Sequence, residues 1–163
     1  MITKPFSPRD IFAQPVVNSS RVFLSPQRYI QGPGVIKNCG LYLSLINAKH
    51  VGVLASKRGF SAEAANVLQS LSEAGIEYSK AEFRGECSKE EVERHTDDLM
   101  SAKPDCILAV GGGKLVDAGK CIAYRLNCQV GIVPTLASND APCSSISVLY
   151  TVDGVKDIVE YFP

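Results

Sequence analysis

Hydrophobic residues along the chain form two alternating patterns. Short unbroken apolar runs, such as Val51–Ala55 and Cys106–Val110, are typical of strands buried on both faces of a sheet. Between them, apolar residues recur every three or four positions, which is typical of amphipathic helices. This alternation predicts an α/β fold in which helices cover both faces of an open, mostly parallel sheet.

Turn and capping residues locate the individual elements. Ser61 is expected to cap a helix that ends before Gly75, and Ser88 with Glu91 has the spacing of a capping box. The predicted helices span residues 34–46, 61–73, 88–100 and 114–126, and the predicted strands span residues 22–24, 29–30, 51–55, 76–83, 106–110 and 129–133.

The end of the sequence predicts a different element. Asp153-Gly154 separates two short apolar runs, Ile146–Thr151 and Val155–Glu160. An Asp-Gly pair in this position is a strong signal for the tight turn between two antiparallel strands. The predicted fold therefore includes a β-hairpin near the C-terminus.

The first 20 residues are predicted to be a mobile N-terminal extension (1–20). Pro5, Pro8 and Pro15 interrupt any helix there. A small excess of basic residues is a weak sign of an organelle-targeting segment. We expect the remainder, residues 21–163, to form one domain, since its length suits one hydrophobic core.

Composition argues against several functional classes. Lys+Arg and Asp+Glu both number 17, so charge-driven binding to nucleic acid or an anionic membrane is not expected. No apolar run approaches the ~20 residues of a membrane span. The six cysteines lack CxxC spacing, which is not the pattern of a zinc finger or a redox dithiol. We expect a cytoplasmic protein with buried, reduced thiols such as Cys106 and Cys121, although an even number of cysteines also allows disulfides.

The segment Gly111-Gly112-Gly113 joins a predicted strand to a predicted helix. Glycine lets the backbone approach a phosphate, and the unpaired N–H groups at a helix start attract anions. The segment is not a Walker A loop, because Lys120 is followed by Cys121 and not by Ser or Thr. The residues alone favour a pyrophosphate site and leave a plain tight turn as the alternative.

A second polar segment, residues 134–144, follows the next predicted strand. It contains the hydroxyls of Thr135, Ser138 and Ser144, the amide of Asn139 and the carboxylate of Asp140. The carboxyl ends of neighbouring parallel strands share one edge of a sheet, so this segment should face the same site as the glycines. Its side chains suit a ribose, a carboxamide or a polyol; a plain polar loop is the alternative.

Four segments together resemble the glycerol dehydrogenase family, within the iron-containing alcohol dehydrogenase superfamily. The glycine segment is shared across that superfamily, and Asp140-Ala-Pro-Cys-Ser is more specific. The resemblance covers about Val22 to Pro163 and implies a Rossmann-like domain that binds a nicotinamide dinucleotide. The segments are Tyr29-Ile30-Gln31-Gly32, Gly85-Glu86-Cys87-Ser88, Gly111-Gly112-Gly113-Lys114 with Asp117 and Lys120, and residues 134–151.

The resemblance also implies roles for individual residues. Residues 113–117 hold the pyrophosphate, and Asp140 bonds a hydroxyl of the polyol substrate. No catalytic residue is implied within this sequence. The implied cofactor-binding residues are Ser56, Gly112, Gly113, Lys114, Leu115, Val116, Asp117, Thr135, Leu136, Ala137, Ser138, Ser144, Ile146 and Tyr150, of which the last three contact the nicotinamide half.

One departure from the family concerns the cofactor. Ser56, followed by Lys57 and Arg58, stands where the family usually has an Asp that binds the adenosine ribose. An acid at such a position favours NAD, whereas a nearby Arg or Lys can accept the 2′-phosphate of NADP. The usual setting of such a basic pair, however, is a solvated loop after a strand. We expect NAD, with NADP as the alternative.

A second departure concerns the metal. The family usually holds zinc with an Asp and two His in a helical second half, and this domain is not part of the sequence. His50 and His95 match no metal position and are interpreted as ordinary helix-surface or boundary histidines. We therefore predict no metal site in this chain.

The implied reaction is NAD(P)-linked oxidation of the secondary alcohol of glycerol, or of a similar polyol, to a ketone. For glycerol the product is dihydroxyacetone. Without a metal the hydroxyl stays protonated, so we expect this chain to supply the cofactor-binding half and to be inactive alone. A separate chain could carry the metal-binding half. A stand-alone nucleotide-binding module without catalysis, or a nonfunctional remnant, are the other hypotheses.

Overall fold

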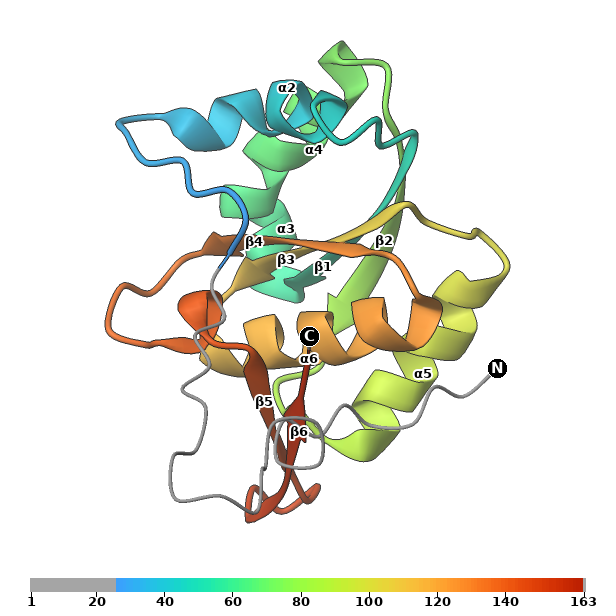
Figure 1. Cartoon of the computed structure of the whole chain (residues 1–163), viewed down its shortest axis with the longest axis vertical. Helices are drawn as coiled ribbons and strands as arrows, with labels where there is room; N and C mark the ends of the chain where they lie inside the picture. Colours follow the sequence, from blue (N-terminus) through green and yellow to red (C-terminus); the bar gives the residue numbers. More distant parts are fainter. Residues whose placement is uncertain (1–25, 163) are drawn as a thin grey trace, which may run out of the picture.

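The computed structural model describes residues 26–162, which form a parallel sheet between two layers of helices (Figure 1). The strands are β1 (His50–Ser56), β2 (Glu77–Phe83), β3 (Cys106–Gly111) and β4 (Gln129–Pro134), in the order β2-β1-β3-β4. The helices are η1 (Val35–Asn38), α2 (Cys39–Ser44), α3 (Lys57–Ser61), α4 (Glu63–Glu73), α5 (Lys89–Met100), α6 (Gly113–Leu126) and η2 (Ala141–Cys143). A separate antiparallel hairpin consists of β5 (Ile146–Tyr150) and β6 (Lys156–Tyr161).

Each face of the sheet has its own apolar core. Helices α2 and α4 cover one face, where Val53 and Leu71 are fully buried, and α5 and α6 cover the other, where Leu54 and Ile122 are (Figure 1). Successive side chains of a strand point to opposite faces, so a strand covered on both sides needs an unbroken apolar run. The predicted α/β fold, with helices on both faces and a hairpin near the C-terminus, is confirmed.

The four predicted parallel strands lie within one or two residues of the observed ones. The predicted helix 34–46 is a 3-10 turn, η1, that continues into α2. The strand expected at 22–24 and the extension 1–20 lie outside the described residues.

Two local predictions are wrong. Tyr29-Ile30 is not a strand, and Tyr29 is 74% exposed; two apolar residues carry too little periodicity to define an element. Ser61 does not cap a helix either, because it is the last residue of α3 and α4 begins after Ala62. Ser56 caps α3 instead, with its Oγ accepting a hydrogen bond from the Gly59 N–H at 3.0 Å. A helix of five residues is too short to leave a readable pattern.

All six cysteines are free thiols, and Cys106 and Cys121 are buried as predicted. Burial raises the pKa of Cys106 to about 12. The reactive form of cysteine is the thiolate, so this thiol is inert at neutral pH.

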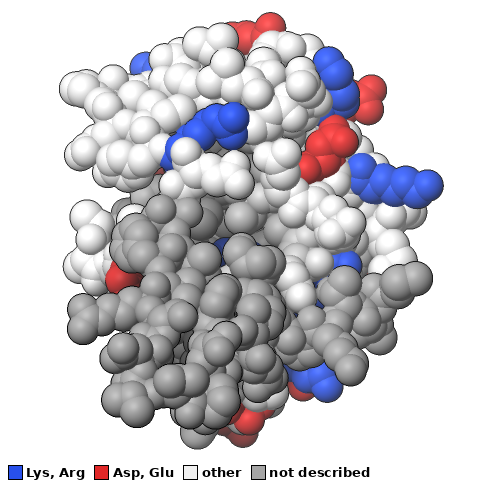
Figure 2. All heavy atoms as spheres, in the orientation of Figure 1, with Lys and Arg blue, Asp and Glu red and all other residues white. Residues whose placement is uncertain are grey.

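The surface of the described residues carries charges of both signs. On the face shown in Figure 2, Lys and Arg side chains are interspersed with Asp and Glu outside the grey region. Among residues 26–162, no helix combines the length and the apolar character that crossing a bilayer requires.

Candidate functional site at the carboxyl edge of the sheet

The strand order reverses between β1 and β3. From β1 the chain moves to β2 on one side, and then crosses to β3 and β4 on the other. In open α/β sheets, ligands bind beyond the carboxyl ends of the strands at such a reversal. Ser56 ends β1 and Gly111 ends β3, so the predicted residues after both strands lie at this edge.

The glycine turn presents open backbone at the start of α6. Gly112 is the N-cap of this 14-residue helix, and no side chain caps it. A Cβ built on Gly112 meets no atom within 4 Å, although its φ of −85° and ψ of −178° suit any residue. Glycine at this position therefore leaves room for something other than protein. Free N–H groups at the start of a helix with open space before them fit a phosphate.

Asn139 supplies an unpaired polar atom beside this turn. Its side-chain N–H donates to the carbonyl of Leu136, while its Oδ1 is buried without a hydrogen-bond partner. This Oδ1 lies 3.4 Å from the point where a Cβ of Gly113 would stand. Because a buried acceptor is costly to leave unpaired, Asn139 fits a ligand hydroxyl or N–H.

Lys114 adds a cation to the first turn of α6. Its Nζ donates to Glu86 Oε2 at 2.6 Å and lies 5.0 Å from the ring centroid of Tyr150. The hydrogen bond to Glu86 raises the pKa of Lys114. The Lys114 side chain is 49% exposed, so it remains accessible to an anion.

The structure brings most of the predicted residues to this edge. The Thr135 N–H donates to the Gly111 carbonyl at 3.0 Å, which places the exposed residues 135–138 next to the glycine turn. Tyr150 comes from β5, and Ser144 and Ile146 are bound to α6 through their carbonyls. Asp140 is exposed just before η2.

Three predicted residues cannot offer side chains to a ligand. Leu115 and Val116 are buried in the core, so only their backbone can take part. The Asp117 carboxylate points to the hairpin, where its Oδ2 accepts the Val148 N–H at 3.1 Å. A polar residue on an otherwise apolar helix face does not reveal in sequence whether it faces a ligand or another part of the protein.

Sequence reasoning assigned no individual role to Glu86 or Lys120, and it gave the Asn139 amide only as one of several polar groups suited to a ribose, a carboxamide or a polyol. Lys120 carries the clearest signal: it follows Asp117 by one helical turn on the buried face of α6, the spacing of a buried ion pair. Glu86 gives no such signal, because its partner Lys114 is far away in sequence.

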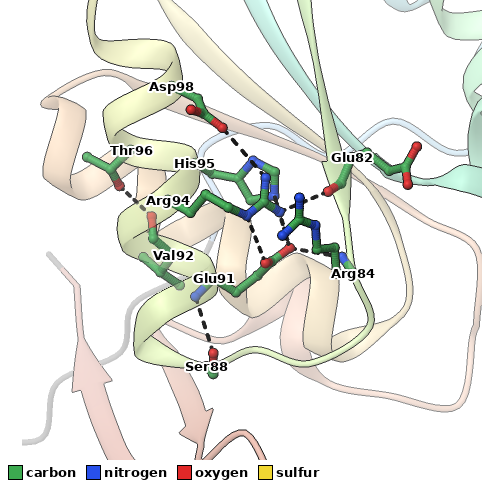
Figure 3. A network of polar contacts seen from close by, with 9 residues as sticks. All are labelled: Glu82, Arg84, Ser88, Glu91, Val92, Arg94, His95, Thr96 and Asp98. Carbon is green, nitrogen blue, oxygen red and sulfur yellow. Dashed lines mark hydrogen bonds and ion pairs between the residues drawn. The ribbon is translucent and has the colours of Figure 1, made fainter.

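A polar network on α5 supports the loop that carries Glu86 (Figure 3). Ser88 caps α5 by accepting the Glu91 N–H at 3.2 Å, as predicted. The Glu91 carboxylate does not return to Ser88, as a full capping box requires; it accepts the Arg84 N–H at 2.9 Å and an Arg94 N–H at 2.7 Å. The network thus fixes both ends of the turn between β2 and α5.

His95 is part of this network and corrects a prediction. It is 1% exposed, not at the helix surface, because it lies on the inward face with Val92 and Leu99. Its Nε2 lies 3.1 Å from Glu91 Oε1 and 2.9 Å from an Arg94 nitrogen, while its Nδ1 has no partner. Burial, and then Arg94, lower the pKa of His95, which favours the neutral ring in the folded protein. Burial raises the pKa of Glu91, but hydrogen bonds from Arg94 and Arg84 outweigh it, and the net pKa lies below the usual value.

We expect the free energy of unfolding to fall on acidification. Below about pH 6.5 the unfolded state protonates His95 and the folded state resists it, so stability falls by up to about 1.4 kcal/mol per pH unit for this one proton. The stabilisation from Glu91 is lost later, as the pH passes below its own lowered pKa. Urea denaturation of wild type and of His95→Gln between about pH 7 and about pH 5 tests this. The slope should be shallower in the variant, and equal slopes would exclude His95 as its source.

The described residues do not fit a metal ion. Within residues 26–162, no three His, Cys, Asp or Glu side chains lie close enough together to hold one. His50 begins β1, the predicted boundary position. Its Nδ1 lies 2.9 Å from the Ala102 carbonyl and its Nε2 2.9 Å from Ser79 Oγ.

Comparisons with known proteins identify the family of the chain. The family model for iron-containing alcohol dehydrogenases matches residues 26–162. The glycerol dehydrogenase of Escherichia coli is 39% identical over 137 residues, which are 84% of this chain and 37% of that protein. The crystal structure of glycerol dehydrogenase from Schizosaccharomyces pombe superposes with a TM-score of 0.76 at 36% identity, over 90% of this chain and 37% of that one. A probable glycerol dehydrogenase from Sinorhizobium meliloti gives a TM-score of 0.80 at 33% identity, over 88% and 39%. The chain thus spans less than two fifths of the length of these relatives.

Proposed function

The chain belongs to the iron-containing alcohol dehydrogenase family, and from this premise we propose that residues 21–163 form the dinucleotide-binding domain of a polyol dehydrogenase. The proposed reaction oxidises the secondary alcohol of glycerol, or of a similar polyol, to a ketone. NAD or NADP accepts the hydride. The relatives named glycerol dehydrogenase support the substrate class.

The open turn at the start of α6 carries this proposal. Gly112 leaves the space before the helix empty, and the ammonium group of Lys114 lies on the first turn of the same helix. A pyrophosphate in this space receives hydrogen bonds from the first N–H groups of α6 and a charge contact from Lys114.

The other predicted residues contact the two halves of the dinucleotide, adenosine and nicotinamide, separately. The adenosine half extends toward Ser56 at the end of β1, because that strand lies next to β3. The nicotinamide half lies against Ser144, Ile146 and Tyr150, and Asp140 orients a polyol hydroxyl. When bound, the nicotinamide ring supplies the acceptor for the hydride.

We propose NAD as the preferred cofactor. No acidic side chain follows β1, since Ser56 is succeeded by Lys57 and Arg58, and this arrangement leaves NADP as the alternative. The Ser56 hydroxyl caps α3 and keeps an oxygen at the end of the strand. A hydroxyl can bond a ribose but does not repel a 2′-phosphate as a carboxylate does.

We propose that this chain, assayed by itself, binds the cofactor without oxidising the polyol. A carboxylate such as that of Asp140 is a weak base toward an alcohol, and the described residues offer no metal site. The relatives continue beyond the matched region in the same polypeptide, so they give no support to a separate metal-binding chain. Added Zn²⁺ should therefore not produce turnover of glycerol by the purified chain.

We propose a cytoplasmic location and no nucleic-acid or membrane partner. Free thiols persist in reducing compartments, and all six cysteines are thiols. The formal net charge is zero, which gives no general attraction to polyanions.

Isothermal titration of the purified chain with NAD and NADP tests the cofactor assignment. We expect saturable binding of one molecule, with a dissociation constant between about 1 μM and about 1 mM, the range that is usual for the KM values of enzymes. NAD should bind more tightly than NADP. A folded chain that binds neither would refute the proposal.

Ser56→Asp sharpens the test. Aspartate also caps helices, so α3 keeps its N-cap. The added carboxylate should raise the ratio of NAD affinity to NADP affinity at least about tenfold above that of wild type. This change corresponds to about 1.4 kcal/mol. Ser56→Ala removes the oxygen without adding charge and serves as the control.

A further inference from the structure

Two charged side chains in the second turn of α6 attach the hairpin to that helix. Asp117 and Lys120 lie one helical turn apart, both buried, with Lys120 Nζ 2.8 Å from Asp117 Oδ1. Lys120 is only 6% exposed, and a buried ammonium needs partners for each of its three donors.

Lys120 finds these partners outside its own helix. Its Nζ donates to the carbonyls of Ala141 at 3.0 Å, of Ser144 at 3.2 Å and of Ile146. These carbonyls belong to residues 141–148, which we call the hairpin entry. The three N–H bonds are thereby used, so the Asp117 carboxylate acts on the ammonium as a neighbouring charge.

Asp117 binds the same segment from the other side. Its Oδ2 accepts the Val148 N–H at 3.1 Å, and its backbone carbonyl accepts the Ser147 hydroxyl at 2.9 Å. Ser147 is fully buried. Five hydrogen bonds from two residues therefore position the hairpin entry on α6.

The hairpin has other attachments as well. Among residues 26–162, β5 and β6 form a ladder only with each other, but Tyr150 makes an isolated parallel bridge with Ser88, and Leu149 is buried in the same apolar core as Ile122. The Tyr150 N–H donates to the Cys87 carbonyl at 2.8 Å. The ion pair Arg125–Glu160, at 3.2 Å, joins the far end of α6 to β6.

We propose that Asp117 and Lys120 are positioning residues for the nicotinamide half of the cofactor. They hold Ser144, Ile146 and Tyr150 at a fixed distance from the turn at Gly112. The inference rests on the proposed function and assigns different roles to two turns of α6. The first turn binds the phosphates, and the second turn positions Ser144, Ile146 and Tyr150, which we call the nicotinamide wall.

The test compares a ligand that contacts the nicotinamide wall with one that does not. NADH occupies the whole proposed site, whereas ADP needs only the glycine turn and the region of Ser56. The double variant Asp117→Asn/Lys120→Met removes both charges together, so that neither is left buried alone. Affinities for NADH and ADP are measured by titration, and hydrogen exchange of the amides at 146–150 reports on the attachment of the hairpin.

We expect the double variant to bind NADH at least 30-fold more weakly and ADP within threefold of wild type, with faster exchange at 146–150. Ser147→Ala, a smaller change that removes one hydroxyl, should shift NADH binding and exchange in the same direction by a few-fold. The matched control, Arg125→Met/Glu160→Gln, removes the other ion pair between α6 and the hairpin and should leave both affinities within threefold.

Three outcomes would overturn the inference. The double variant could keep wild-type affinity for NADH, it could lose ADP and NADH binding equally, or the control pair could weaken NADH binding as much. A wild-type chain that binds neither ligand would refute the proposed function, and this inference with it. Because that result appears in the unmodified protein, the two failures are distinguishable.

Discussion

Gly112→Val is expected to abolish dinucleotide binding while leaving the protein folded. A Cβ at this position meets no protein atom within 4 Å, and the backbone conformation suits valine. The added side chain fills the space that we assign to the pyrophosphate. Loss of two charge-assisted hydrogen bonds, about 1.5–3 kcal/mol each, corresponds to at least about a hundredfold loss of affinity.

Titration with NAD and thermal denaturation of the same sample separate binding from folding. The free energy of unfolding should fall by less than about 1 kcal/mol, since valine is a poorer N-cap residue than glycine. Ala65→Val, at an exposed position on α4 away from this edge, is the control for adding a branched side chain. Wild-type affinity in Gly112→Val would mean that the phosphates lie elsewhere.

Gly119→Val, the same substitution farther along α6, is expected to destabilise the fold, whereas Gly112→Val should block binding and leave the fold intact. A Cβ at Gly119 would stand 2.6 Å from the Cβ of Ala109 on β3, a separation that real Cβ atoms do not show. Helix α6 rests on the sheet at this position, so it must move away and leave a gap around buried neighbours. We expect a loss of about 3 kcal/mol or more in the free energy of unfolding.

For a chain of this length, such a loss lowers the melting temperature by about 6–12 °C. Differential scanning calorimetry measures it directly. Gly112→Val is the natural control, because both variants replace a glycine of the same element. A Gly119→Val protein that melts like wild type would show that α6 does not rest on β3 here.

The fold could be predicted because its strongest determinants are local. Buried parallel strands require unbroken apolar runs, and Cys106–Val110 is such a run. The capping residue Ser88 and the turn at Asp153-Gly154 act within a few residues of themselves. By contrast, α3 could not be seen, because its five residues give no full helical period.

The site could be predicted only in outline. The glycine turn and the polar segment at 135–140 are visible because backbone freedom and side-chain chemistry are properties of residue type. The direction of the Asp117 carboxylate is not such a property, since it depends on Val148, which folding brings close. The burial of His95 was missed although Val92 and Leu99 mark the same face of α5 as apolar. What the sequence does not show is that the Arg84 N–H, from the turn after β2, binds Glu91, the neighbour of His95.

The strand order has a consequence for the speed and sequence of folding. Strands β3 and β4 are joined directly through α6, whereas β2 and α5 lie between β1 and β3 in the sequence. Where β1 and β3 begin, the His50 N–H donates to the Asp105 carboxylate at 2.9 Å, and these two residues are 55 positions apart. Closing so long a loop costs entropy before any contact repays it. We therefore expect the unit from β3 to β4, with its glycine turn, to form early. The pairing of β1 with β3, which completes the edge where the cofactor is proposed to lie, should be the slow step.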